Sequence, residues 1–549
     1  MSWSRQETTR TSVCGEGCLA VAGRRETVEA GLGVMAQGGN AVDAAVAMAF
    51  TAAVAEPTEA SIGGSGFMLV HDPASGNAWS IEFPPRAPLR ATADMYAPAA
   101  DGVADRLLGT VPVRGDANAT GWLAPCVPGV VAGLCLAHAR FGLLGLANLV
   151  EPAAALAEHG FEVDSYLSLQ ALEHIGDLRA SREAARIFLR DGLPPAAPFA
   201  TRAAAPRLRQ PELARTLRAI AAGGAEAFYR ADVAGAIHEA FERHGGLISC
   251  TDLRRYSATI ERPLSASYRG WSVLAPRAPT GGWTVLQALQ ILDRIEVEPD
   301  SVAELHAVAE ALQLAFLDRY RAAGDVDAAD LLSASRADEL AELIRSDGKA
   351  APTERMPASP WRGHGTTHLC AVDADGRTVS CTITAGNTFG GKVVADGTGV
   401  LFDSGMAWFD PRPGRANSIA PWKRPLVNMA PLLLIRGDDR IALGAAGGRR
   451  IISAVTQVAR GVIDHGLPLQ EAISAPRLDA SDRTIRLSDR FPEGTAEALR
   501  ALGHELLVIE EQHLPFSYEF ARPAGARVDA SGIRSGGIHP LAQGFVGVT

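Results

Sequence analysis

The segment that most restricts the fold of this chain begins at His364 and reads HGTTHLCAVDADGRTVSCTIT. Two runs of strand-forming residues, LCAV and TVSCTIT, flank the turn ADGR, which is the pattern of a β-hairpin. The preceding stretch, from about residue 322 to 363, starts with a helical pattern and ends in polar, proline-containing sequence. The sequence therefore predicts a strand pair right after His368, behind a segment whose end is exposed.

The rest of the chain alternates helical and strand patterns. Residues 24 to 56 predict two helices rich in small residues, the second capped by Asn40, and residues 62–70 and 79–83 predict two strands. The middle third has apolar residues at three- and four-residue spacing, and the last third adds strands at PLLLIRG and RIALGAAGG and a helix from Ile451. The predicted fold class is α/β, with layers of sheets and helices.

Composition narrows the possible partners. The 549 residues include 62 acidic and 52 basic side chains, a net charge of −10 that opposes binding to nucleic acid. No secretory signal and no run of about 18 uncharged apolar residues is found, so we expect a cytoplasmic protein with no membrane partner. The seven cysteines have no metal-ligand spacing, and His364 and His368 lack a third ligand, so no metal, cofactor or disulfide is predicted.

Thr366 is the residue of this segment best suited to act as a catalytic nucleophile. A threonine hydroxyl is a weak nucleophile that needs an adjacent base. If the Gly365–Thr366 bond is cut, the freed α-amino group, with a pKa of about 7.7 to 8.0, becomes that base. The same hydroxyl can make the cut by attacking the carbonyl of Gly365, where glycine adds little bulk. By itself, however, Gly-Thr-Thr is most often a turn that enters a strand.

Sequence blocks that follow one another along the chain decide between a catalytic Thr366 and a plain turn. They are AQGGNAVDAAVA, EPTEASIGGSGFML, VPGVVAGL, EPAAALAEHGFEV, QPELARTLRAIAAGG, YRGWSVLAPRAPTGG, GTTHLCAVDADGRTVSCTIT, GTGVLF, KRPLVNMAP and GAAGGRRII. From about residue 20 to 545 the chain resembles the γ-glutamyltranspeptidase family. The resemblance implies a four-layer αββα sandwich of the N-terminal-nucleophile hydrolase type. It also implies autocatalytic cleavage into fragments 1–365 and 366–549, which remain together as a heterodimer in one intertwined globular unit.

The resemblance also implies roles for individual residues. Thr366 matches the nucleophile and new N-terminus, and Thr384 matches a second threonine whose hydroxyl supports it. Gly447 and Gly448 match the glycine pair whose backbone N–H groups form the oxyanion hole. Each such donor contributes about 2.7 to 4 kcal/mol to transition-state stabilisation. Without Thr366, the glycines of GAAGGRR would favour a plain strand-to-helix turn that needs positive φ, and such a turn is compatible with an oxyanion hole.

The positions that grip a γ-glutamyl group differ from the family pattern. An Arg-Glu pair, an Asp-Asp pair, a Ser-Ser pair and an asparagine are replaced, respectively, by Pro84 and Pro85, by Ala407 and Trp408, by Val427 and Asn428, and by Gly386. We therefore predict that the acyl group is not a standard γ-glutamyl, because an unpaired buried charge is costly. The predicted substrate-binding residues, which include neighbours of the lost positions, are Arg86, Asn387, Trp408 and Asn428.

Three functions are compatible with these observations. The first is a threonine hydrolase or acyltransferase that cleaves an amide, or an activated C–C bond, of a small molecule. Altered relatives implied by the resemblance include cephalosporin and oxamate amidohydrolases and enzymes of 4-alkylproline antibiotic pathways. The second is an ordinary glutathione hydrolase. The third is a non-catalytic binding protein on the same fold.

Overall fold

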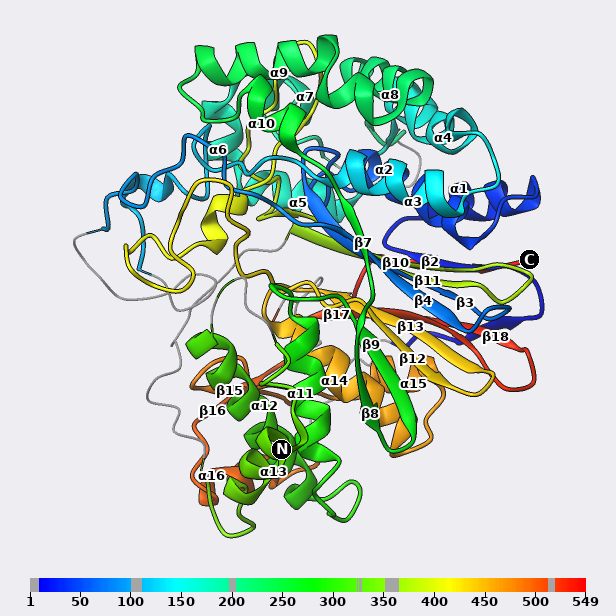
Figure 1. The fold of residues 1–549 in the computed structure, drawn as a ribbon, viewed down its shortest axis with the longest axis vertical. Coiled ribbons are helices and arrows are strands. Elements are labelled where there is room, and N and C mark those ends of the chain that lie inside the picture. Colours follow the sequence, from blue (N-terminus) through cyan, green and yellow to red (C-terminus); the bar gives the residue numbers. More distant parts are fainter. Residues whose placement is uncertain are drawn as a thin grey trace.

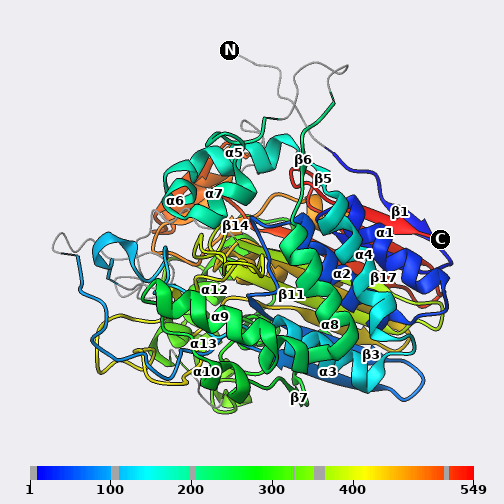
Figure 2. The same ribbon diagram turned by 90° about the horizontal axis from the view of Figure 1, so that it is seen from above.

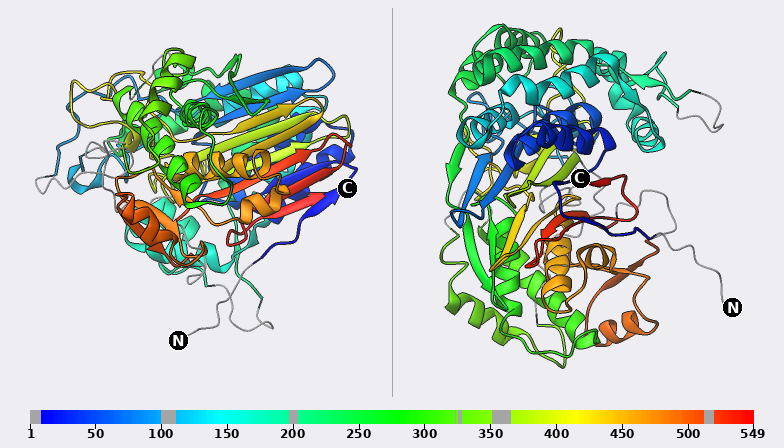
Figure 3. Two further views of the ribbon diagram at one scale, coloured as in Figure 1. Left: turned by 90° about the horizontal axis from the view of Figure 1, so that it is seen from below. Right: turned by 90° about the vertical axis from the view of Figure 1, so that its right-hand side faces the viewer.

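The molecule is built of four layers, seen edge-on in Figure 3. The computed structural model describes residues 9–99, 111–196, 204–322, 324, 328–350, 365–511 and 519–549. Two seven-stranded sheets lie face to face, and one layer of helices covers the outer face of each sheet (Figure 1). This arrangement confirms the predicted αββα sandwich.

Every neighbouring pair of strands in the two large sheets is antiparallel. The first sheet has the order β19 (Phe545–Val548), β2 (Leu19–Ala22), β10 (Gly365–Val372), β11 (Thr378–Gly386), β3 (Ser65–Asp72), β4 (Asn77–Phe83) and β7 (Thr259–Glu261). The second has the order β1 (Val13–Gly15), β18 (Arg534–Ile538), β17 (Arg522–Val528), β13 (Asp439–Ala446), β12 (Leu432–Arg436), β9 (Trp271–Ala275) and β8 (Leu264–Tyr268).

Both sheets mix strands from the two sides of the Gly365–Thr366 bond. In the first sheet, β10 lies between β2 and β11, and β11 in turn pairs with β3. In the second sheet, β12 pairs with β9. The parts of the chain before and after residue 365 are therefore joined by continuous backbone hydrogen bonding and share both sheets.

The helices fall into two groups (Figures 1 and 2). The first sheet is covered by α1 (Arg25–Ala36), α2 (Ala41–Ala55), α3 (Val130–Phe141), α4 (Leu146–His159), α5 (Ser165–Glu173), α6 (Ile175–Ala180), α7 (Arg182–Phe188), α8 (Pro211–Tyr229), α9 (Asp232–Arg243) and α10 (Cys250–Arg255). The second is covered by α11 (Gly282–Leu292), α12 (Val302–Ala322), α13 (Ala334–Leu343), α14 (Arg450–Ile463), α15 (Leu469–Ser474) and α16 (Thr495–Ala501). None of the described helices is both long and apolar enough to cross a membrane.

The remaining regular elements are short. They are the strand pair β5 (Phe161–Glu162) and β6 (Arg207–Leu208), the three-stranded sheet of β14 (Leu478–Asp479), β15 (Ile485–Ser488) and β16 (Leu506–Ile509), and the 3₁₀ helices η1 (Arg114–Asp116) and η3 (Gly405–Trp408).

Helix α2 shows why the first layer packs closely. Asn40 caps its N-terminus by accepting hydrogen bonds from the backbone N–H groups of Val42 and Asp43, as the sequence predicts. All fifteen residues of α2 are buried, and most are alanine or valine. Because small side chains allow close approach, α2 packs between α1, α4 and the strands β10 and β11. It ends at Ala55, and the turn that follows carries Glu56 and Glu59 toward the start of β10.

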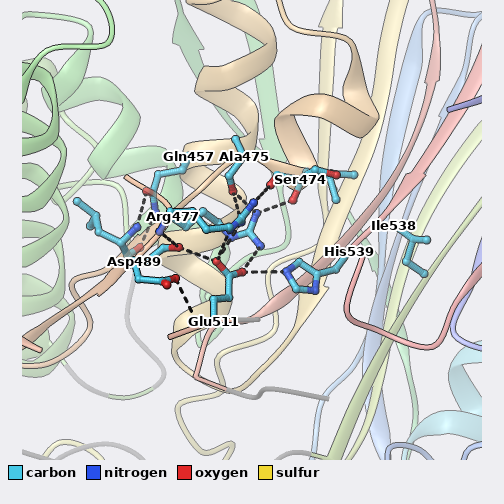
Figure 4. Close-up of polar contacts among 12 residues, drawn as sticks. Gln457, Ser474, Ala475, Arg477, Asp489, Glu511, Ile538 and His539 are labelled. Carbon is cyan, nitrogen blue, oxygen red and sulfur yellow. Dashed lines mark hydrogen bonds and ion pairs between the residues drawn. The ribbon is translucent and has the colours of Figure 1, made fainter. Parts of the chain in front are cut away.

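A buried ion cluster fixes the three-stranded sheet to the second large sheet. Glu511 accepts hydrogen bonds from Ser488 and Arg490, and Arg477 and His539 lie within 3.9 and 3.4 Å of its carboxylate (Figure 4). Burial alone would raise the pKa of Glu511, but these donors and charges lower it to about 2. The carboxylate therefore stays ionised although it is almost fully buried.

Candidate active site

The Gly365–Thr366 peptide bond lies at a β-bulge at the start of β10. Gly365 pairs with Gly386 of β11, whereas Thr366 pairs with Thr384, so Ala385 is the extra residue. The N–H of Ala385 donates instead to the backbone carbonyl of Glu59. The bulge interrupts the ladder at the bond that is predicted to be cut.

Two threonine hydroxyls and one backbone carbonyl meet at this bond. The Oγ1 atoms of Thr366 and Thr384 are 2.9 Å apart, and the Thr384 hydroxyl donates to the carbonyl oxygen of Gly365 over 2.5 Å. The Thr384 Oγ1 also accepts the N–H of Gly386 at 2.9 Å. Since that hydroxyl has one proton, which it gives to Gly365, the Thr366 hydroxyl is the donor in its contact with Thr384. The hydroxyl of Thr366 and the carbonyl of Gly365 are thus both hydrogen-bonded to the hydroxyl of Thr384.

Glycine is the residue that fits at position 365. A Cβ atom there would lie 2.2 Å from the carbonyl oxygen of Asn387, a distance that real Cβ atoms do not reach. Gly386, opposite, has a φ of +89°, and a side chain on it would meet Ser404. The close approach of the two strands at the bulge depends on both glycines.

Glu59 holds the nitrogen of Thr366. Its Oε2 atom accepts the Thr366 N–H at 3.0 Å, while its Oε1 atom accepts hydrogen bonds from Arg522 and Tyr166. The sequence did not identify these three residues. Glu59 belongs to the EPTEASIGG block, but Tyr166 and Arg522 are far from it in the sequence, and no local pattern connects them.

Gly447 and Gly448 follow β13 and precede α14. Their φ angles are +141° and +61°, so both use conformations that favour glycine. A Cβ atom on Gly447 would lie 2.6 Å from the Cα atom of Ala521. The residue before the pair, Ala446, lines the same cavity as Thr366, which brings the glycine turn to the site. The positive end of the α14 dipole lies next to this turn and favours an oxyanion there.

The predicted substrate-binding residues Arg86 and Asn387 lie on loops near the ends of β4 and β11. The Arg86 guanidinium donates to the carbonyl oxygen of Trp422 at 3.1 Å and lies 5.6 Å from the centre of its ring. The N–H of Asn387 donates to Ser404. Neither is among the described residues that line the cavity beside Thr366.

Trp408 and Asn428 lie in a buried region around an apolar cluster. The cluster consists of Phe67, Ala119, Ala407, Trp408, Leu426, Val427 and Met429. The Oδ1 atom of Asn428 accepts a hydrogen bond from the buried guanidinium of Arg319 at 3.1 Å. Its Nδ2 atom is buried and has no hydrogen-bond partner among the residues that the structure describes. Arg319 thus orients the amide and leaves its Nδ2 donor unused, and neither Trp408 nor Asn428 is among the described residues that line the cavity beside Thr366.

Two histidine-containing groups have the residue types of a metal site, but their ligand atoms are already engaged. His368 uses both ring nitrogens, one toward Thr382 at 2.9 Å and the other toward Cys370 at 3.2 Å, and burial lowers its pKa to about 3. His364 lies outside the described residues. Glu304, near His465 and Asp300, already accepts hydrogen bonds from Arg460 and a backbone N–H, so its oxygens are engaged.

The fold is an αββα sandwich, and Thr366 lies at the start of an internal strand. Its hydroxyl is linked to the carbonyl of Gly365 through the hydroxyl of Thr384. Together these features define an N-terminal-nucleophile hydrolase. Comparison with known proteins identifies the family. The chain belongs to the gamma-glutamyltranspeptidase family, whose profile matches residues 27–519. It is therefore an enzyme of the hydrolase and acyltransferase type, as the sequence analysis predicted.

Individual relatives differ in their named activities. The chain is 37% identical over 488 residues to the acylase ACY 1 proenzyme of Pseudomonas sp. (strain V22), and the matched region covers 87% of this chain and 85% of that protein. It is 32% identical to the glutathione hydrolase proenzyme of Escherichia coli (strain K12), over 94% of this chain and 90% of that protein. The crystal structure of cephalosporin acylase from Bacillus halodurans matches with a TM-score of 0.85 and 27% identity, and covers 100% of this chain and 98% of that chain.

Proposed function

We propose that the chain cuts itself between Gly365 and Thr366 and then uses Thr366 to hydrolyse an amide whose acyl part is not an amino acid. The observation that carries the proposal is the hydrogen bonding of Thr366 and Gly365 to the single hydroxyl of Thr384. This arrangement provides a nucleophile, an activated carbonyl and a proton path between them.

Self-cleavage begins when Thr366 Oγ1 attacks the carbonyl carbon of Gly365. The attacking hydroxyl gives its proton to Thr384, and Thr384 gives its own proton to the carbonyl oxygen as negative charge develops there. When the C–N bond breaks, the proton returns from that oxygen to the departing nitrogen of Thr366. The product is an ester between Gly365 and Thr366, and water hydrolyses it to a carboxylate and a free hydroxyl.

The mature reaction reuses the same groups. The new α-amino group of Thr366 has an intrinsic pKa of about 7.7 to 8.0 and accepts the hydroxyl proton during attack on the substrate amide. The N–H groups of Gly447 and Gly448 are proposed to bind the oxyanion. Because fragments 1–365 and 366–549 share both sheets, we expect them to stay together as a heterodimer.

The surroundings of Trp408 support an acyl group without an α-ammonium. An indole and the side chain of Val427 are packed in an apolar cluster where the family pattern has polar residues. An ammonium buried among these apolar side chains would lose its hydration, and the cluster itself offers no carboxylate to pair with it, which is costly. The unused Nδ2 donor of Asn428 suits a carboxylate or carbonyl of the substrate instead. These features favour acylase activity, in line with the 37% identity to an acylase proenzyme.

Glutathione hydrolysis is the second candidate, because a glutathione hydrolase proenzyme is 32% identical over 94% of this chain. Two anilides that differ only in one amino group separate the candidates. We expect the purified protein to hydrolyse glutaryl-p-nitroanilide at least about tenfold faster, in kcat/KM, than γ-glutamyl-p-nitroanilide, a difference of about 1.4 kcal/mol in transition-state binding. Faster turnover of the γ-glutamyl compound, or brisk hydrolysis of glutathione, would contradict the proposed specificity.

A place in a biosynthetic pathway is a separate part of the proposal. The family resemblance includes homologues in 4-alkylproline antibiotic pathways that are implicated in cleaving a C–C bond, and the altered residues at Pro84, Trp408, Val427 and Gly386 support a similar role here. Mass spectrometry after incubation with a 4-alkylproline precursor is the direct test. Loss of a fragment through C–C cleavage would favour this role, and an unchanged precursor would limit the activity to amides.

A further inference from the structure

The cavity beside Thr366 contains four buried or half-buried charged side chains that the proposed function does not use. Two are acidic and two are basic. The charged lining residues are Arg24, Glu56, Glu59 and Arg522, and the lining residues Tyr166 and Thr366 donate hydrogen bonds to Glu59. A cavity next to a nucleophile is an unfavourable place for such charges unless they are paired or have a chemical role.

Glu59 is the charged residue that touches Thr366 directly. The residue is 3% exposed, and its carboxylate accepts three hydrogen bonds: one from the Thr366 N–H at 3.0 Å, one from Arg522 at 3.0 Å and one from Tyr166 at 2.5 Å. All three partners are donors, and they satisfy an ionised carboxylate. Glu59 is thus fixed from three directions with one oxygen on the reacting residue.

The fold places Glu59 and Arg522 independently. The N–H of Glu59 bonds to the carbonyl of Glu56 in the turn after α2, and its carbonyl accepts the N–H of the bulged Ala385. Arg522 is the first residue of β17 in the other sheet, where it pairs with Ala446 directly before the glycine turn. The ion pair between Glu59 and Arg522 therefore links the two sheets at the nucleophile.

We propose that Glu59 and Arg522 act as a clamp that holds the nitrogen of Thr366 before cleavage and sets the proton affinity of its α-amino group afterwards. This inference rests on the proposed function of Thr366. Both residues are positioning residues, since they act through Thr366.

The two charges have opposite effects on the amine. A carboxylate beside an ammonium favours the charged form and raises the pKa of the amine, whereas the guanidinium lowers it, so the pair keeps the base usable near neutral pH. Burial raises the pKa of Glu59, and Arg522 partly reverses that rise. Glu56 and Arg24 face the same cavity, and burial raises the pKa of Glu56 to about 7. Tyr166, the third partner, donates its hydroxyl proton to Glu59.

The test uses Glu59→Gln and Arg522→Gln in the full chain, with p-nitrophenyl acetate as the acylating probe. Attack by Thr366 Oγ1 forms an acetyl ester, releases p-nitrophenolate and passes the proton to the α-amino group. The rate of acetylation, followed by the mass of the fragment that begins at Thr366, rises with pH as the amine loses its proton. We expect the midpoint to fall by about one pH unit in Glu59→Gln and to rise by about one unit in Arg522→Gln.

Arg527→Gln is the matched control, because Arg527 lies on the same strand and pairs with Asp439 away from the site. It is expected to cleave itself and to keep the wild-type midpoint. If a clamp variant stays uncut but keeps the thermal midpoint of the control, the nitrogen-holding part is supported, and Arg522→Lys, which keeps the charge, should restore cleavage. Normal cleavage with unmoved midpoints, or shifts in the same direction, would overturn the clamp. A wild-type chain that is not cut would instead refute the proposed function.

Discussion

Replacing Thr384 with valine tests the central hydrogen-bond arrangement, since valine keeps the shape of threonine and removes only the hydroxyl. The variant loses the donor to the Gly365 carbonyl and the acceptor for the Thr366 hydroxyl. Loss of one donor to a developing oxyanion costs about 2.7 to 4 kcal/mol, so self-cleavage should slow by about 10² to 10³ fold. The Gly386 N–H also loses its acceptor, which should lower the free energy of unfolding by about 1 to 3 kcal/mol.

The assay is cell-free synthesis with a short radioactive pulse, followed by gel separation of the full chain from its fragments over time. Thr382→Val is the control, because Thr382 is equally buried on β11 and bonds to His368, away from the scissile bond. It should lose similar stability yet cleave at close to the wild-type rate. Cleavage of Thr384→Val within about threefold of this control would refute the proton path.

Two further predictions concern the bulge and the ion cluster. Gly365→Ala should slow self-cleavage by about 100-fold in the same pulse assay, because its Cβ would lie 2.2 Å from the carbonyl oxygen of Asn387 and displace the reacting bond; a wild-type rate would contradict this. Glu511→Gln should lower the free energy of unfolding by about 3 kcal/mol at pH 7, because the pKa of Glu511 falls from 4.5 to about 2 on folding. In wild type this stabilisation is complete above about pH 4.5 and is lost as pH falls toward 2, whereas denaturant titrations of the variant should lack that component.

Local patterns predicted the elements around the site because each has a short-range cause. The cap at Asn40, the proline that begins α8 and the ADGR turn each fix an element boundary from neighbouring residues. The strands β17, β18 and β19 were not predicted. Their sequence is rich in glycine and arginine, and their pairing depends on strands far away in the chain.

The residues of the site also fall into those that the sequence identified and those that it did not. Thr366, Thr384 and the Gly447–Gly448 pair were identified through the family resemblance, and the structure brings the two threonines into hydrogen-bond contact. Their catalytic roles stay predictions. The clamp could not be found, because Tyr166 and Arg522 reach Glu59 across 107 and 463 residues of sequence. Only the packing of α5 and of the second sheet against the start of β10 makes those contacts.

The identity of the nucleophile is the central claim, and intact-mass analysis of the purified protein tests it most directly. Wild type and Thr367→Ser should each give two fragments, with the second beginning at Thr366, whereas Thr366→Ala should remain one chain of 549 residues. A wild-type protein that stays uncut, or a Thr366→Ala variant that still splits at the same bond, would contradict the account.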